Sequence, residues 1–179
     1  ERNELTMNMG KHGITTQTPE NIPFGAGTYH KNLQWNAEKS AWEGTCIGAT
    51  SGGGKLSIAG EYVDIALDGA LVNWKGQTIK QGGKATMEVT MAEFTGDNIK
   101  MVAHFKEDTT NEVNGFVKYI DKPDIETGDY IDNFAFVGKT ATGKPIIVIF
   151  ESSLCKSALE LEPKNKENAT FKATMEAYA

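Results

Sequence analysis

The stretch Lys84–Phe105, KATMEVTMAEFTGDNIKMVAHF, contains the two clearest structural patterns of the chain. Between positions 85 and 91 every second residue is apolar, namely Ala85, Met87, Val89 and Met91. Because successive side chains of a β-strand point to opposite faces, this alternation predicts a strand with one apolar face and one polar face.

A helical pattern follows at once. The Thr95 hydroxyl can accept a hydrogen bond from a free amide at a helix start, and Ile99, Val102 and Ala103 form an apolar stripe at helical spacing. The stretch therefore predicts one strand that leads into one short helix. The only other helix candidate, at 152–161, has a weaker pattern, and the prolines and glycines of 18–27 argue against helix there.

The rest of the chain predicts short strands and turns. We expect strands at 28–33 (an edge strand), 42–48, 55–59, 62–68, 130–137, 144–150 and 171–176, and less regular ones near 115–120 and 159–161. The expected fold is mainly β, an antiparallel sandwich or barrel of two sheets with one flanking helix. Residues 1–17 show no periodicity and are expected to form a flexible arm before a single domain at 18–179.

Composition narrows the function classes. The chain has 179 residues and a net charge of −6, and Arg2 is its only arginine. Proteins that grip nucleic acid usually rely on the guanidinium group, so we expect no specific nucleic-acid binding. No apolar run approaches the ~20 residues that cross a bilayer, and no signal peptide is evident, so we expect a protein made in the cytoplasm.

The local motifs do not add up to an active site. Ala49–Lys55 resembles a phosphate-binding loop but lacks its first glycine and the Ser or Thr after the lysine. The residues Ser51, Gly52, Gly53 and Gly54 are instead expected at a flexible hairpin tip. Histidines 12, 30 and 104 are too scattered for zinc, and neither Ser152 nor Ser153 has the nucleophile-elbow motif. Cys46 and Cys155 are expected to be reduced and packed as small apolar groups. We expect no cofactor and no enzymatic activity.

Two alternatives stay open at this point. The acidic turn Asp121–Asp129 could hold calcium, although Asp beside Pro123 and Gly128 is also typical of an ordinary turn. Trp35, Trp42 and Trp74 could form a platform for stacking sugars, although buried or interface tryptophans are commoner.

Four phrases carry a resemblance to a known family: 11–32 (KHGITTQTPENIPFGAGTYHKN), 48–70 (GATSGGGKLSIAGEYVDIALDGA), 84–100 (KATMEVTMAEFTGDNIK) and 159–179 (LELEPKNKENATFKATMEAYA). They resemble the major tail proteins, or tail tube proteins, of long-tailed bacteriophages. The resemblance extends over the chain from about Met9 and leaves residues 1–8 outside.

The resemblance implies a structural virion protein located in the tail. In that family six subunits form a ring, strands of neighbours join into a barrel around a channel, and the rings stack into a tube. The implied partners are further copies of the chain, the tape measure protein, and the tail initiator and terminator proteins. The genomic DNA passes through the channel without specific binding.

Combining the patterns with the resemblance gives candidate sites. The lumen-facing candidates are Asp64, Asp68, Glu88 and Glu176, mixed with lysines, which predict an acidic wall that repels DNA. Ser51–Gly54 is the candidate inter-ring loop, and the stripe Ile99, Val102 and Ala103 is the candidate inter-subunit helix face. The alternatives are a monomeric carbohydrate-binding sandwich and a secretion-system tube protein.

Overall fold

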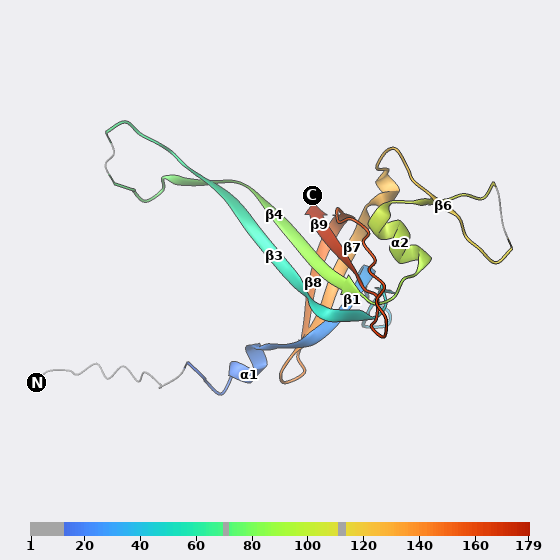
Figure 1. The fold of residues 1–179 in the computed structure, drawn as a ribbon. Helices are drawn as coiled ribbons and strands as arrows, with labels where there is room; N and C mark the ends of the chain where they lie inside the picture. The colour runs from blue at the N-terminus through green and yellow to red at the C-terminus, as the bar shows by residue number, and fades with distance from the viewer. Residues whose placement is uncertain (1–12, 70–71, 111–113) are drawn as a thin grey trace, which may run out of the picture.

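The computed structural model describes residues 13–69, 72–110 and 114–179, and its fold is mainly β and antiparallel (Figure 1). A seven-stranded sheet has the strand order β2-β1-β7-β8-β9-β4-β3, and β5 and β6 form a small second sheet. The strands are β1 (Pro23–Asn36), β2 (Ala41–Cys46), β3 (Thr50–Asp64), β4 (Thr78–Met91), β5 (Lys106–Glu107), β6 (Tyr119–Ile120), β7 (Ile131–Thr140), β8 (Pro145–Cys155) and β9 (Phe171–Tyr178). The helices are α1 (Thr18–Asn21), α2 (Gly96–Ala103) and the 3-10 turn η1 (Thr127–Asp129).

The predicted strand-to-helix unit is confirmed. Met87, Val89 and Met91 of β4 are buried, while the residues between them stay partly accessible. Thr95 caps α2 as expected, because its Oγ1 accepts a hydrogen bond from the amide of Asn98 at 3.3 Å. The helix ends at Ala103, and the residue that caps its C-terminus, His104, has the left-handed backbone conformation.

The seven-stranded sheet bends over itself, and its two halves enclose the core. Residues from both halves and from α2 form one buried cluster, which includes Tyr29 of β1, Phe134 of β7, Met175 of β9 and Val102 of α2. The expected layers are therefore parts of one continuous sheet. Helix α2 covers the core at one end, where His104 Nε2 lies 2.7 Å from the carbonyl oxygen of Cys155 in β8.

The hairpin of β3 and β4 extends well beyond this core (Figure 1). Its strands have 15 and 14 residues, which corresponds to about 45 Å at ~3.3 Å per residue. Within β4 only Thr86–Met91 pair with β9, so the outer part of β4, residues 78–85, pairs with β3 alone. That part is a two-stranded ribbon, which we call the arm (residues 58–64 and 78–85).

Several sequence-based expectations were wrong in detail. Strand β1 is not an edge strand, since β2 and β7 flank it. The strand expected at 55–59 and the first part of the one expected at 62–68 form a single strand, because Gly60 continues the pairing opposite Gly83, and residues 65–68 lie beyond its end. A short helix occurs at Thr18–Asn21, where Pro19 fits because the first turn needs no amide donor. Residues 152–155 complete β8, and the rest of 152–161 is neither helix nor strand. Of the flexible N-terminal segment expected at 1–17, residues 1–12 lie outside the described residues.

The enclosed core provides a test of this fold. Phe134 is fully buried, so Phe134→Ala should lower the free energy of unfolding by about 3–5 kcal/mol. Phe116 is 78% exposed, and the matched change Phe116→Ala should cost at most about 0.5 kcal/mol. Urea unfolding followed by circular dichroism measures both. Equal losses in the two variants would contradict the assigned core.

Candidate functional site

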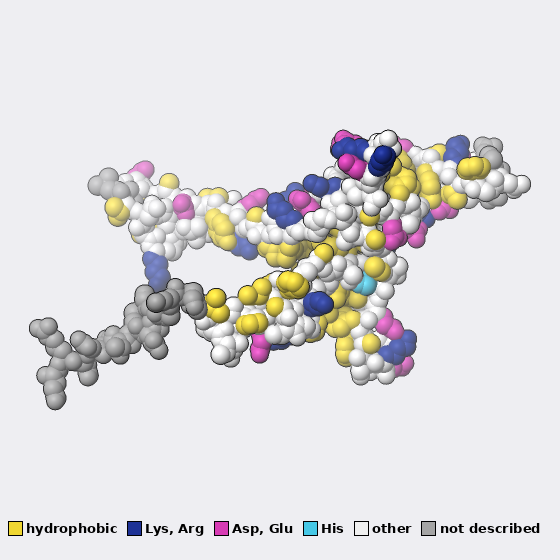
Figure 2. Space-filling view, turned by 60° about the horizontal axis from the view of Figure 1, so that its bottom comes forward, with side chains coloured by type: hydrophobic (Ala, Val, Ile, Leu, Met, Phe, Trp, Pro, Cys, Tyr) yellow, Lys and Arg dark blue, Asp and Glu magenta, His cyan; other side chains and the backbone are white. Residues whose placement is uncertain are grey.

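The arm exposes large apolar side chains. Ile58 is 73% exposed, and Tyr62, Val63 and Ile79 are also exposed. Figure 2 shows hydrophobic side chains on both sides of an open gap between the β3–β4 hairpin and the part of the sheet that contains β1. At the inner end of this gap a hollow of about 290 Å³ has a mostly apolar lining, which includes Tyr29, Leu56 and Phe136.

The seven-stranded sheet has two free edges. Strands β2 and β3 occupy its ends, so the sheet does not close into a barrel within the described part of one chain. A free edge presents unpaired backbone amides and carbonyls that can pair with another strand. The β3 edge is the longer of the two, at 15 residues.

One face of β3, β4 and β9 is polar, and we call it the polar face. Its residues alternate with buried ones on β4 and β9 and with Gly54, Leu56, Ile58 and Gly60 on β3, and we end the face at Glu61, where the pairing with β4 shifts. They are Lys55, Ser57, Ala59 and Glu61 of β3, Lys84, Thr86, Glu88 and Thr90 of β4, and Lys172, Thr174 and Glu176 of β9.

The structure brings together only two of the four lumen-facing candidates. Glu88 and Glu176 both lie on the polar face. Asp64 has the same alternation as Leu56 and Ile58 along β3, so it lies on the opposite face, where Thr78 Oγ1 donates a hydrogen bond to its carboxylate at 2.5 Å. Asp68 lies past the end of β3. The four carboxylates therefore do not form one acidic wall within a subunit.

Glu176 is the best-connected charge of the polar face. Its carboxylate lies 2.6 Å from Lys84 Nζ of β4 and 2.9 Å from Lys156 Nζ in the segment after β8. Hydrogen bonds from Lys84 and then Lys156 lower the pKa of the Glu176 carboxyl from its ordinary 4.5 to about 2. Lys156 also lies over the ring of Tyr178, 5.0 Å from its centroid. These contacts could not be predicted from the sequence, because their partners are far apart along the chain.

The glycine-rich candidate loop is not a hairpin tip. Ser51–Gly54 belongs to β3, and the pairing with β4 shifts between Thr50 and Gly54. Gly52 and Gly53 have φ of 76° and 77°, so they form a bulge in a conformation that favours glycine. The role of these residues between rings stays a prediction.

The predicted inter-subunit face of α2 is wrong in one residue. Val102 packs into the chain's own core and is only 2% exposed, so it cannot contact a neighbour. Ile99 and Ala103 are half-buried. The buried side of α2 is formed by Asn98, Met101 and Val102, and Asn98 belongs to it because its Nδ2 donates to the carbonyl oxygens of Ile47 and Glu93.

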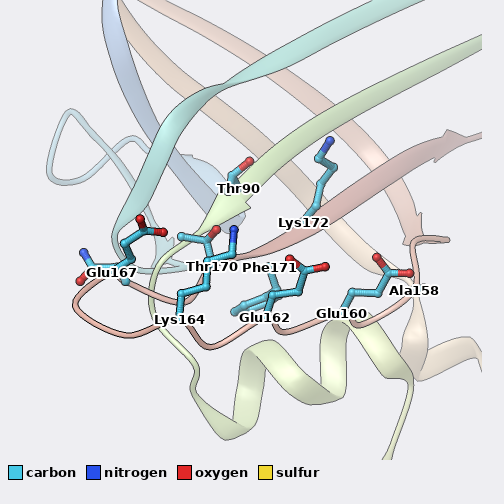
Figure 3. A pocket seen from close by; sticks show the side chains of 10 residues that line it. Thr90, Ala158, Glu160, Glu162, Lys164, Glu167, Thr170, Phe171 and Lys172 are labelled. Carbon is cyan, nitrogen blue, oxygen red and sulfur yellow. The ribbon is translucent and has the colours of Figure 1, made fainter.

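An open polar hollow of about 570 Å³ lies beside the polar face (Figure 3). Thr90 and Lys172 line it from the sheet, and the segment between β8 and β9 contributes Glu160, Glu162, Lys164 and Glu167. Both signs of charge occur here, and the hollow continues the mixed charge of the polar face.

The acidic turn is organised by a lysine. Lys122 Nζ lies 2.5 Å from Asp129 and 3.4 Å from Glu126, so it neutralises two of the carboxylates that could have held calcium. Within residues 13–69, 72–110 and 114–179, no group of three or more His, Cys, Asp or Glu side chains is arranged to hold a metal ion.

The remaining sequence candidates are scattered. Trp35 and Trp42 pair across β1 and β2 with ring centroids 5.7 Å apart, but Trp74 lies in the turn of the other hairpin. Ser153 donates to the carbonyl of Ile131. Cys155 is buried as expected, whereas the expectation for Cys46 was wrong, since that thiol is exposed.

The sequence matches no protein-family model and no curated protein. In the described part of the chain no helix is long and apolar enough to span a membrane.

The Glu176 contacts predict a pH-dependent stability. The folded pKa lies below the unfolded one, so the unfolded state binds more protons between pH 4.5 and 2, and stability falls as pH decreases through this range. Glu176→Gln should therefore destabilise the protein at pH 7, and the difference from the native chain should shrink as pH approaches 2. Urea unfolding at several pH values measures this. A carboxyl resonance of Glu176 that titrates near 4.5 would refute it.

Proposed function

We propose that this chain is a non-enzymatic structural subunit that polymerises into stacked six-membered rings, forming a hollow tube like the tails of the phages whose major tail proteins it resembles. The observation that carries the proposal is the arm. The resemblance supplies the ring symmetry, the virion location, and the tape measure, initiator and terminator partners.

The arm favours assembly because an isolated two-stranded ribbon is marginally stable in water. Its apolar side chains are largely exposed in the single chain, and each large aliphatic side chain gains about 1.5–3 kcal/mol when it is fully buried. A neighbouring copy can bury them and can pair with the free edge of β3. The contact is heterologous, because the arm and the surface that receives it differ, and such contacts generate rings or fibres.

The proposal predicts tubes or stacked rings in the purified protein. Negative-stain electron microscopy over a concentration series, with light scattering for mass, should show hollow particles that grow with concentration. A secretion-system tube would give the same particles and would be distinguished by the genes beside its own.

The carbohydrate-binding alternative rests on the exposed Trp35–Trp42 pair, in which the two residues are 53% and 45% exposed. A strict monomer at every concentration, together with oligosaccharide binding that Trp35→Ala abolishes and Trp74→Ala retains, would favour this alternative and reject the tube.

A single arm residue provides the sharper test. Ile58→Asp should leave the fold intact, because exposed substitutions usually change stability by at most about 0.5 kcal/mol, but it should abolish tube formation at concentrations where the native chain assembles. Ile58→Val keeps the apolar surface and should assemble normally. If Ile58→Asp forms tubes as readily as Ile58→Val, the arm does not mediate assembly.

A further inference from the structure

The polar face is a continuous, accessible surface three strands wide. On β4 and β9 it alternates with Met87, Val89, Met91, Ala173 and Met175, all of which are buried. The hydroxyls of Thr86, Thr90 and Thr174 lie between its charged groups. The segment between β8 and β9 borders it at two places, at Glu176 through Lys156 and at the polar hollow (Figure 3).

The charges of this surface nearly cancel. It carries three lysines (Lys55, Lys84, Lys172) and three glutamates (Glu61, Glu88, Glu176), and Lys156 adds one positive charge from the adjacent segment. Its net charge is therefore between zero and +1. It becomes −1 when the adjoining hollow is included, because Glu160, Glu162, Glu167 and Lys164 together add −2, whereas the whole chain carries −6. Neighbouring strands lie ~4.8 Å apart, which is less than the ~8–10 Å Debye length of physiological salt, so the fields of opposite charges on them largely cancel.

All positive groups of the polar face are lysines, and one of them, Lys84, already faces Glu176 together with Lys156 of the adjacent segment. A lysine ammonium is a strongly hydrated point charge without the planar fork that lets arginine hold a phosphate with two hydrogen bonds. A polyanion next to this surface would meet neither strong repulsion nor a strong binding group.

From these observations we infer that the polar face lines the channel of the tube and presents a charge-balanced wall, along which a nucleic acid can slide without retention. This inference rests on the proposed function and adds to it which face of which strands borders the channel. It differs from the acidic wall expected from sequence, since Asp64 faces the other way and lysines offset Glu88 and Glu176.

Two positions on one strand test the lining. Lys55 and Asp64 are both exposed residues of β3, and they lie on opposite faces. In a Cys46→Ser background, which removes the exposed native thiol, Lys55→Cys should react in tubes with a small maleimide and lose its reaction with a maleimide on a long polyethylene glycol. In tubes, Asp64→Cys should not combine reaction with the small maleimide and loss of reaction with the maleimide on polyethylene glycol. The unassembled subunits of each variant, which should react with both reagents, are the control.

The outcomes separate the two proposals. Failure of the native chain to form tubes rejects the proposed function itself. Tubes in which Lys55→Cys reacts with both reagents, or with neither, reject the lining and leave the tube intact. Lys172→Cys, on β9 of the same face, should repeat the Lys55→Cys result if the Lys55 variant fails to assemble.

Charge balance is tested by sedimenting tubes with a short duplex DNA. Native tubes should not retain the duplex at physiological salt, and tubes of Glu61→Lys with Glu88→Lys should retain it in a salt-dependent way, because lysines that neutralise phosphates release counterions. Salt-dependent retention by native tubes would overturn the charge-balanced wall.

Discussion

The pairing of β4 with β9 on one side and β3 on the other organises this molecule. Over Thr86–Met91 the strand has neighbours on both sides and its apolar face is closed by the core, so the alternation of the sequence becomes a buried face and a wet face. On the N-terminal side of residue 86, β4 no longer pairs with β9, but it continues to pair with β3. The same two strands therefore form both the stable centre and the projecting arm.

Because the hairpin continues beyond the core, a single chain leaves apolar side chains and strand edges exposed. Among the residues that the structure describes, sixteen buried hydrophobic side chains stabilise the body, but the apolar residues of the arm have nothing comparable around them. The free edges of β2 and β3 have backbone groups that are satisfied only by water or by another strand. Contact with another copy of the chain would bury the apolar side chains and pair the backbone groups of the free edges. The proposed tube provides this contact.

The polar face is organised by charged side chains and not by apolar contacts. Its charges come from three strands and a connecting segment, and they are placed so that opposite signs meet, most clearly at Glu176 between Lys84 and Lys156. Such pairs tie β4, β9 and the segment after β8 together at the surface. They also leave the face with little net charge, although the chain as a whole is acidic.

The sequence by itself determined the mainly antiparallel β class, the strand with buried Met87, Val89 and Met91, and the helix capped by Thr95, because these depend on local periodicity and capping. Only the tertiary structure decided that Gly60 continues a strand, that Gly52 and Gly53 form a bulge, and that Val102 is buried in the chain's own core. A glycine fits a turn, a bulge or a strand, and its partner strand selects among them. The faces of Asp64 and Glu88 were likewise undecided, since a face is defined only by strand register and by the element that covers it.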